Sequence, residues 1–98
     1  MPKFAAGVVK FQHDVFPGNA ALFEKLAEGQ APEALFITCS DSRIETGMLT
    51  QSQPGDLFIV RNAGNIVPPH TNETGSTTAA IEYACIALNV PHIVICGH

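Results

Sequence analysis

The chain has 98 residues, of which 46% are hydrophobic and only 14% are charged, and its formal net charge is −4. This composition excludes a disordered chain, and five Lys and Arg residues offer no basic surface to nucleic acid or to an acidic membrane. The charged fraction lies well below the ~25% of an average globular domain, which indicates a chain that buries one face against a partner. Three widely spaced cysteines argue against a disulfide framework and favour a cytoplasmic protein. No apolar run approaches the ~18 residues that span a membrane.

Residues 1–29 are predicted to form two helices. The first is an amphipathic helix over 3–15, because apolar residues recur there at helical spacing: Phe4, Val8, Phe11 and Val15. Pro17-Gly18 ends this helix. Asn19 is predicted to cap a second helix over 20–28, which stops at Gly29.

Residues 30–98 are predicted to form an α/β core. Three nearly continuous apolar runs, 34–39, 56–60 and 92–96, are typical of strands that are covered on both faces of a parallel sheet. Helices are predicted between the strands over 44–50 and 75–88, the second opened by Ser76 or a nearby Thr. Since 75–88 is apolar nearly all round, we expect both the sheet and another subunit to bury it. The fold class is therefore a parallel β-sheet with flanking helices and right-handed crossovers.

Polar side chains follow the predicted strands at their carboxyl ends, where such sheets bind ligands. Cys39 ends the first strand and His98 follows the third. If these two strands are neighbours, the thiolate and the imidazole converge as zinc ligands. The alternatives are a small buried cysteine and a solvated histidine. Cys96 is a further candidate ligand, for which packing in the core is the competing explanation.

Asp41 and Arg43 come directly after Cys39. A guanidinium that binds the carboxylate with two hydrogen bonds fixes its direction and keeps it ionised; an ordinary surface ion pair is the alternative. Asp41 could orient a metal-bound water or occupy a coordination position itself. A phosphatase-type anion loop is disfavoured, because it needs five residues between Cys and Arg and here there are three. Asn62 and Asn65, on either side of Gly64, predict a turn in which their side chains bond the local backbone.

Taken together, four motifs resemble the β-class carbonic anhydrases: Cys39-Ser40-Asp41-Ser42-Arg43, the segment 55–65, Glu82-Tyr83 and Ile95-Cys96-Gly97-His98. The similarity runs from about Gln30 to the last residue, and the order and spacing of the motifs make it specific. Members of the family are zinc enzymes that convert carbon dioxide reversibly to bicarbonate and work as dimers or larger oligomers. The resemblance thus implies a Zn²⁺-dependent carbonate dehydratase that forms a homodimer or higher homo-oligomer.

The resemblance also implies roles for particular residues. Cys39 and His98 match two zinc ligands, and Asp41 with Arg43 matches the catalytic dyad, Asp41 being the residue that binds zinc in the closed form of some members. Three residues match the lining of the carbon dioxide pocket, two of them (the first and last) reaching in from a neighbouring subunit in some members: Gln30, Phe58 and Tyr83. Residues 1–29 resemble the helical arm that packs on the partner subunit.

The family's third protein ligand is a Cys three residues beyond the His, and this sequence ends at His98. We therefore expect residues 1–98 to form a single partial domain, with an arm over 1–29 and a βαβ core over 30–98, and to have little or no activity alone. Two other functions are compatible with the sequence. One is an inactive homologue that dimerises with a full-length subunit, and the other is a metal-free module that binds phosphate or sulfate at residues 39–43.

Overall fold

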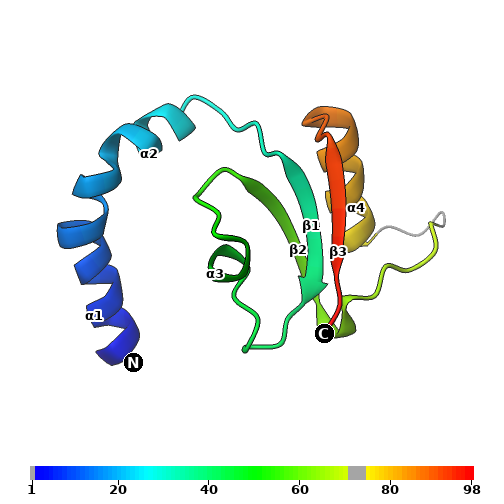
Figure 1. Ribbon diagram of the computed structural model, residues 1–98, viewed down its shortest axis with the longest axis horizontal. Helices are drawn as coiled ribbons and strands as arrows, with labels where there is room; N and C mark the ends of the chain where they lie inside the picture. Colours follow the sequence, from blue (N-terminus) through cyan, green and yellow to red (C-terminus); the bar gives the residue numbers. More distant parts are fainter. Residues whose placement is uncertain (1, 71–74) are drawn as a thin grey trace. The chain divides into compact units, whose positions relative to one another are not determined.

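The computed structural model describes residues 2–70 and 75–98 (Figure 1). The chain divides into two compact units, one ending at Gln30 and the other spanning Ala31–His98. The predicted fold class is confirmed, since the second unit is a three-stranded parallel sheet with flanking helices.

The unit that ends at Gln30 is helical, as its apolar spacing predicted. Helix α1 (Pro2–Lys10) continues as a π-helical turn (Phe11–Val15), and a 3-10 turn (Pro17–Asn19) leads into α2 (Ala20–Leu26). Three phenylalanine rings hold the bend together, with centroids 5.3 to 6.1 Å apart: Phe11, Phe16 and Phe23.

The predicted capping role of Asn19 is wrong. Its side chain makes no cap hydrogen bond to α2, and its amide Nδ2 instead donates to the Val15 carbonyl at 2.9 Å. The cause is the backbone of the tight turn: the Asn19 N–H bonds the Phe16 carbonyl at 3.0 Å, so the Val15 carbonyl lacks its usual helical donor. The side chain supplies that donor, so it joins the two helices rather than opening the second.

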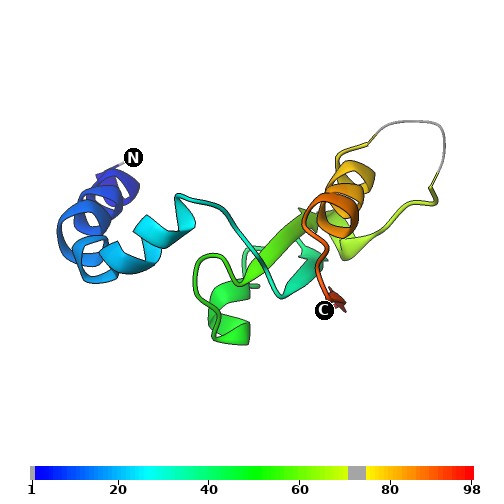
Figure 2. The same ribbon diagram turned by 90° about the horizontal axis from the view of Figure 1, so that it is seen from above.

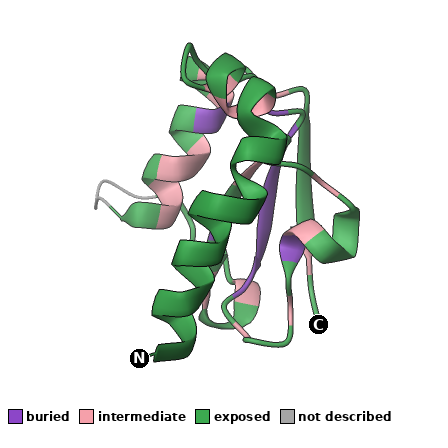
Figure 3. Cartoon of the chain, turned by 90° about the vertical axis from the view of Figure 1, so that its left-hand side faces the viewer, coloured by how far each residue is buried: buried purple, intermediate pink, exposed green. Residues whose placement is uncertain are grey.

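The sheet of the second unit has the order β2-β1-β3, with all strands parallel. The strands are β1 (Ala34–Cys39), β2 (Leu57–Asn62) and β3 (His92–Cys96), close to the predicted ranges. All six residues of β1 are buried, as its unbroken apolar run predicted, and Figure 3 shows the buried residues concentrated on this strand. The central strand therefore forms the core, and the chain winds away from it in both directions.

Helices lie on both sides of the sheet (Figures 1 and 2). On one side, α4 (Ser76–Glu82) continues as a π-helical turn (Tyr83–Ala87), and Ala84 packs on a core of Leu35, Ile37 and Val60. On the other side lies α3 (Thr46–Thr50), two residues shorter than predicted because Glu45 caps it by accepting the Gly47 N–H at 3.3 Å.

The predicted cap of the helix over 75–88 needs correction. Neither Ser76 nor a threonine caps it, because Gly75, which has no side chain, occupies the cap position. The sheet buries one side of this helix, while Ile86 is 80% exposed and Tyr83 is 50% exposed within one chain, so burial by another subunit stays a prediction. In the described ranges 2–70 and 75–98, no helix combines the length and the hydropathy needed to cross a membrane.

Because Leu35 is fully buried at the centre of the core, we expect Leu35→Ala to lower the free energy of unfolding by about 3 kcal/mol. The control is Ile86→Ala, on the exposed side of the helical turn Tyr83–Ala87, which should change this free energy by less than about 0.5 kcal/mol. Urea unfolding followed by circular dichroism measures both. Equal losses in the two variants would contradict this description of the core.

Candidate metal centre

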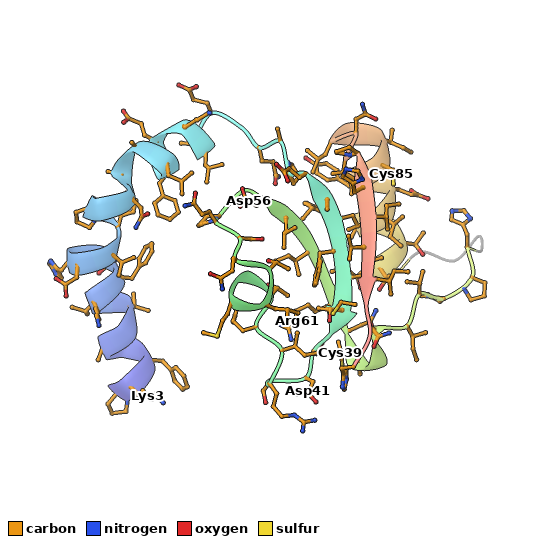
Figure 4. The ribbon with its side chains drawn as sticks, in the orientation of Figure 1. Lys3, Cys39, Asp41, Asp56, Arg61 and Cys85 are labelled. Atoms are coloured by element: carbon orange, nitrogen blue, oxygen red, sulfur yellow. The ribbon has the colours of Figure 1, made fainter. Side chains whose placement is uncertain are left out.

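The parallel register brings the ends of all three strands to one edge of the sheet. Cys39 pairs with Asn62 of β2, and Thr38 pairs with Cys96 of β3, so Gly97-His98 continues alongside the end of β1. The Thr38 hydroxyl, which is fully buried, donates to the Cys96 carbonyl at 3.0 Å and fixes β3 against β1. Figure 4 shows Cys39, Asp41 and Arg61 gathered at this end of the sheet.

The Cys39 sulfur is buried and accepts two backbone hydrogen bonds. The Gly64 N–H donates to Sγ at 3.2 Å and the Asp41 N–H at 3.4 Å. These two donors, with the hydrogen bond and positive charge of the nearby His98 imidazole, hold the pKa of the Cys39 thiol at about 7 instead of 9.0, although burial opposes the shift. The sulfur is thus prepared to act as a thiolate, and His98 lies beside it.

A turn after β2 aims the Gly64 N–H at the sulfur. The Asn62 side chain closes this turn by accepting the Ile66 N–H at 2.9 Å and donating to the Ile66 carbonyl at 2.8 Å. Gly64 has a φ of 85°, a left-handed conformation in which a Cβ would be strained. The predicted turn around Gly64 is therefore present with Asn62, rather than both asparagines, providing its side-chain bonds to the backbone, and its consequence is a hydrogen bond to Cys39.

Asp41 and Arg43 form the predicted two-point ion pair. Arg43 Nε donates to Asp41 Oδ1 at 3.0 Å and Nη2 to Oδ2 at 2.7 Å, while the Arg43 backbone N–H also donates to Oδ1 at 2.9 Å. The side-chain and backbone hydrogen bonds from Arg43 lower the pKa of Asp41 to about 2, with smaller contributions from the charges of His98 and Arg61. The same pair raises the pKa of Arg43. Asp41 is consequently a fixed hydrogen-bond acceptor at neutral pH.

Arg61 is a residue of this site that the sequence analysis did not identify. It lies at the end of β2 and donates three hydrogen bonds to backbone carbonyls of the segment after β1: Nε to Cys39 at 2.9 Å, Nη2 to Asp41 at 2.9 Å and Nη2 to Ile44 at 3.0 Å. The available sequence signal was an arginine at the end of a strand, beside the other polar strand ends.

The predicted pocket residues do not gather around Cys39 within one chain. Phe58 and Tyr83 pack on each other, with ring centroids 5.7 Å apart. Phe58, however, pairs with Leu35, four residues before the Asn62 that faces Cys39, a separation of about 13 Å along the strand. Gln30 is exposed and belongs to the other compact unit.

The donors that converge fit a zinc ion in kind but do not complete its coordination. Cys39 and His98 provide a thiolate and an imidazole, both preferred zinc ligands. The residues in 2–70 and 75–98 contain no group of three His, Cys, Asp or Glu side chains arranged to hold a metal. Both oxygens of Asp41 are bonded to Arg43, and the Cys96 sulfur contacts the Gly97 carbonyl at 3.7 Å.

Comparison with known proteins identifies relatives of this chain. A family model described as carbonic anhydrase matches residues 34–98. The chain is 50% identical over all 98 residues to a carbonic anhydrase of Synechococcus elongatus and covers 36% of that protein. It is also 52% identical over 92 residues, 94% of its length, to a carbonic anhydrase of Pseudomonas aeruginosa, of which it covers 42%. The chain therefore spans less than half the length of these curated relatives.

Solved structures similar to this chain are also carbonic anhydrases. The chain superposes with a TM-score of 0.96 on the β-carbonic anhydrase CcaA at 48% identity, covering 100% of this chain and 44% of that one. It also superposes, with a TM-score of 0.71 and 47% identity, on a tetrameric β-carbonic anhydrase of Sordaria macrospora, covering 99% of this chain and 45% of that one.

The hydrogen bonds to the Cys39 sulfur give a pH-dependent prediction. Alkylation by iodoacetamide requires the thiolate, so in the metal-free folded protein we expect the rate at Cys39 to reach half its maximum near pH 7. The rate is followed by mass spectrometry of the peptide that contains Cys39. In urea the same thiol should titrate near its ordinary value of 9.0. Identical midpoints in the folded and unfolded states would refute the prediction.

Proposed function

This chain belongs to the β-class carbonic anhydrase family, and on that premise we propose that the protein catalyses the zinc-dependent, reversible hydration of carbon dioxide to bicarbonate. The observation that carries the proposal is the meeting of the Cys39 sulfur, His98 and the Asp41–Arg43 pair at one edge of the sheet. The activity is proposed for the whole protein, because the chain spans only 36 to 45% of its relatives.

Cys39 and His98 are the proposed zinc ligands. Their donor atoms suit zinc, and the depressed pKa of Cys39 favours the thiolate that a metal needs near neutral pH. When bound, zinc supplies the Lewis acidity that makes water reactive as hydroxide near neutral pH, the chemistry for which carbonic anhydrases are the standard example.

Asp41 is proposed to orient the attacking water. Its carboxylate, ionised because its pKa is about 2, can only accept a hydrogen bond and therefore leaves a lone pair of the water oxygen directed at the substrate. Arg43 fixes the carboxylate by two side-chain bonds. Because Arg43 bonds both carboxylate oxygens, we favour the water-orienting role of Asp41 over its alternative role as a zinc ligand in a closed site.

Gln30, Phe58 and Tyr83 are proposed to line the carbon dioxide pocket from a second copy of the chain. Phe58 and Tyr83 form one aromatic pair, and their separation from Cys39 along the sheet argues against their serving the same chain's metal. A homo-oligomer would provide them, in keeping with the tetrameric relative from Sordaria macrospora. We further propose that the protein acts in the cytoplasm, because its three cysteines are all free.

A second candidate function is assembly with a longer subunit. It is favoured by one observation: the large hydrophobic side chains of Ile86 and Tyr83 are exposed on their helix. The third hypothesis, a phosphate module at residues 39–43, is disfavoured. The N–H groups of Asp41 and Arg43, which a phosphate would need, already donate to Cys39 Sγ and Asp41 Oδ1.

Cobalt binding tests the proposed ligands in this chain. Co²⁺ replaces zinc in such sites, and coordination by a thiolate produces a charge-transfer band in the near ultraviolet. We expect Co²⁺ to produce the band, Cys39→Ser to abolish it and His98→Ala to weaken Co²⁺ binding. Cys96→Ser, two residues before His98, is the matched control and should keep the band. Its loss in Cys96→Ser, or its survival in Cys39→Ser, would overturn the ligand assignment.

A chimera tests the activity. Residues 1–98 replace the equivalent 36% of the Synechococcus elongatus carbonic anhydrase, and carbon dioxide hydration is followed by stopped flow. The chimera should be active, and Asp41→Asn should lower its kcat/KM by about tenfold to a hundredfold, as the loss of an outer partner at a metal site does. Cys85→Ser is the control for substitution far from the site and should retain the activity. A folded, zinc-loaded chimera without activity would contradict the proposed function.

A further inference from the structure

Arg61 contacts the segment between β1 and α3 at three points. Its Nε donates to the Cys39 carbonyl, and its Nη2 donates to the carbonyls of Asp41 and Ile44, all at 2.9 to 3.0 Å. Neither ion pair found among residues 2–70 and 75–98 involves Arg61. The guanidinium therefore directs its hydrogen bonds to the backbone of the segment 39–44.

Beyond Ser40, the other bonds that shape this segment are local. Asp41 and Arg43 are two residues apart, and the Ile44 N–H donates to the Asp41 carbonyl at 3.0 Å. Such bonds fix the dyad's internal geometry but leave its place relative to the sheet undetermined. The Ser40 N–H bonds the Asn62 carbonyl at 2.8 Å at the base of the segment. Beyond that point, the bonds from Arg61, which span 20 and 17 residues of sequence, join Asp41 and Ile44 to β2.

We propose that Arg61 is a positioning residue, which holds the Asp41–Arg43 dyad in place against the strand end that carries Cys39. An arginine suits this task because its planar fork presents five N–H donors in fixed directions, whereas a lysine offers a single flexible ammonium group. That the segment serves catalysis rests on the proposed function. The positioning itself can be measured without metal or substrate.

Amide hydrogen exchange on the metal-free 98-residue chain tests the proposal. The reporters are the amides of Arg43 and Ile44 in the segment and of Phe36 and Ile37 in β1. In Arg61→Gln, we expect exchange at Arg43 and Ile44 to accelerate by at least about tenfold more than exchange at Phe36 and Ile37, because the lost bonds involve a charged donor. Arg61→Lys should retain part of the protection, since one ammonium group can still reach one carbonyl.

Val60→Ala is the matched control, because this neighbouring residue packs in the core and its hydrocarbon side chain can make no hydrogen bond to the segment 39–44. It should accelerate exchange at Phe36 and Ile37 at least as much as at Arg43 and Ile44, because the loss of core packing acts on the strand. The proposal is overturned if Arg61→Gln shows the same pattern as Val60→Ala. Should Arg61→Gln fail to fold, Arg61→Lys is judged by the same comparison with Val60→Ala. If Co²⁺ does not bind but Arg61→Gln still accelerates exchange mainly at Arg43 and Ile44, the proposed function is rejected and the positioning role of Arg61 stands.

Discussion

The candidate site depends on one constraint, the parallel pairing of β1 with a strand on each side. Because β2 and β3 both start opposite Ala34, all three strands end at the same edge, and the chain segments that leave them converge there. Thr38 adds a buried side-chain bond to the Cys96 carbonyl, which secures this register just below the site. A slip of one residue in β3 would reverse the faces of its side chains and move His98 away from Cys39.

The surroundings of Cys39 show how backbone groups can stabilise a thiolate. Two N–H groups point at the sulfur in the folded chain, so no reorganisation is needed to stabilise the negative charge. One of them comes from Gly64, which has a left-handed conformation in the turn that the Asn62 side chain closes by bonding both the N–H and the carbonyl of Ile66. One supporting N–H group thus comes from the turn after β2 and the other from the segment after β1, and both act on Cys39, the last residue of β1.

Much of the fold could be predicted from the sequence because the apolar runs of its strands are nearly unbroken. Within one chain only β1 is buried along its whole length, whereas β3 is largely exposed, so the expectation of strands covered on both faces holds for β1 alone. Helix caps were predicted less well, since capping depends on which backbone groups lack partners, as at Val15, and this follows from the turn rather than the residue type. Cys39, Asp41, Arg43 and His98 carry recognisable chemistry. Arg61 escaped because its partners are backbone carbonyls, which every residue possesses and which leave no mark in the sequence.

Under the proposed function, the position of the aromatic pair would link catalysis to assembly. Carbon dioxide is apolar, so a pocket for it would need an apolar wall beside the metal. Phe58, however, lies about 13 Å along its strand from the residue that pairs with Cys39 of the same chain, and Tyr83 packs on Phe58. Tyr83 and Ile86 are also exposed, in a chain with an unusually low charged fraction of 14%. A second copy packed on this surface would bury apolar residues and bring an aromatic wall to its neighbour's metal. Under the proposed function, one interface would therefore serve both stability and substrate binding, and an isolated chain would lack part of its pocket.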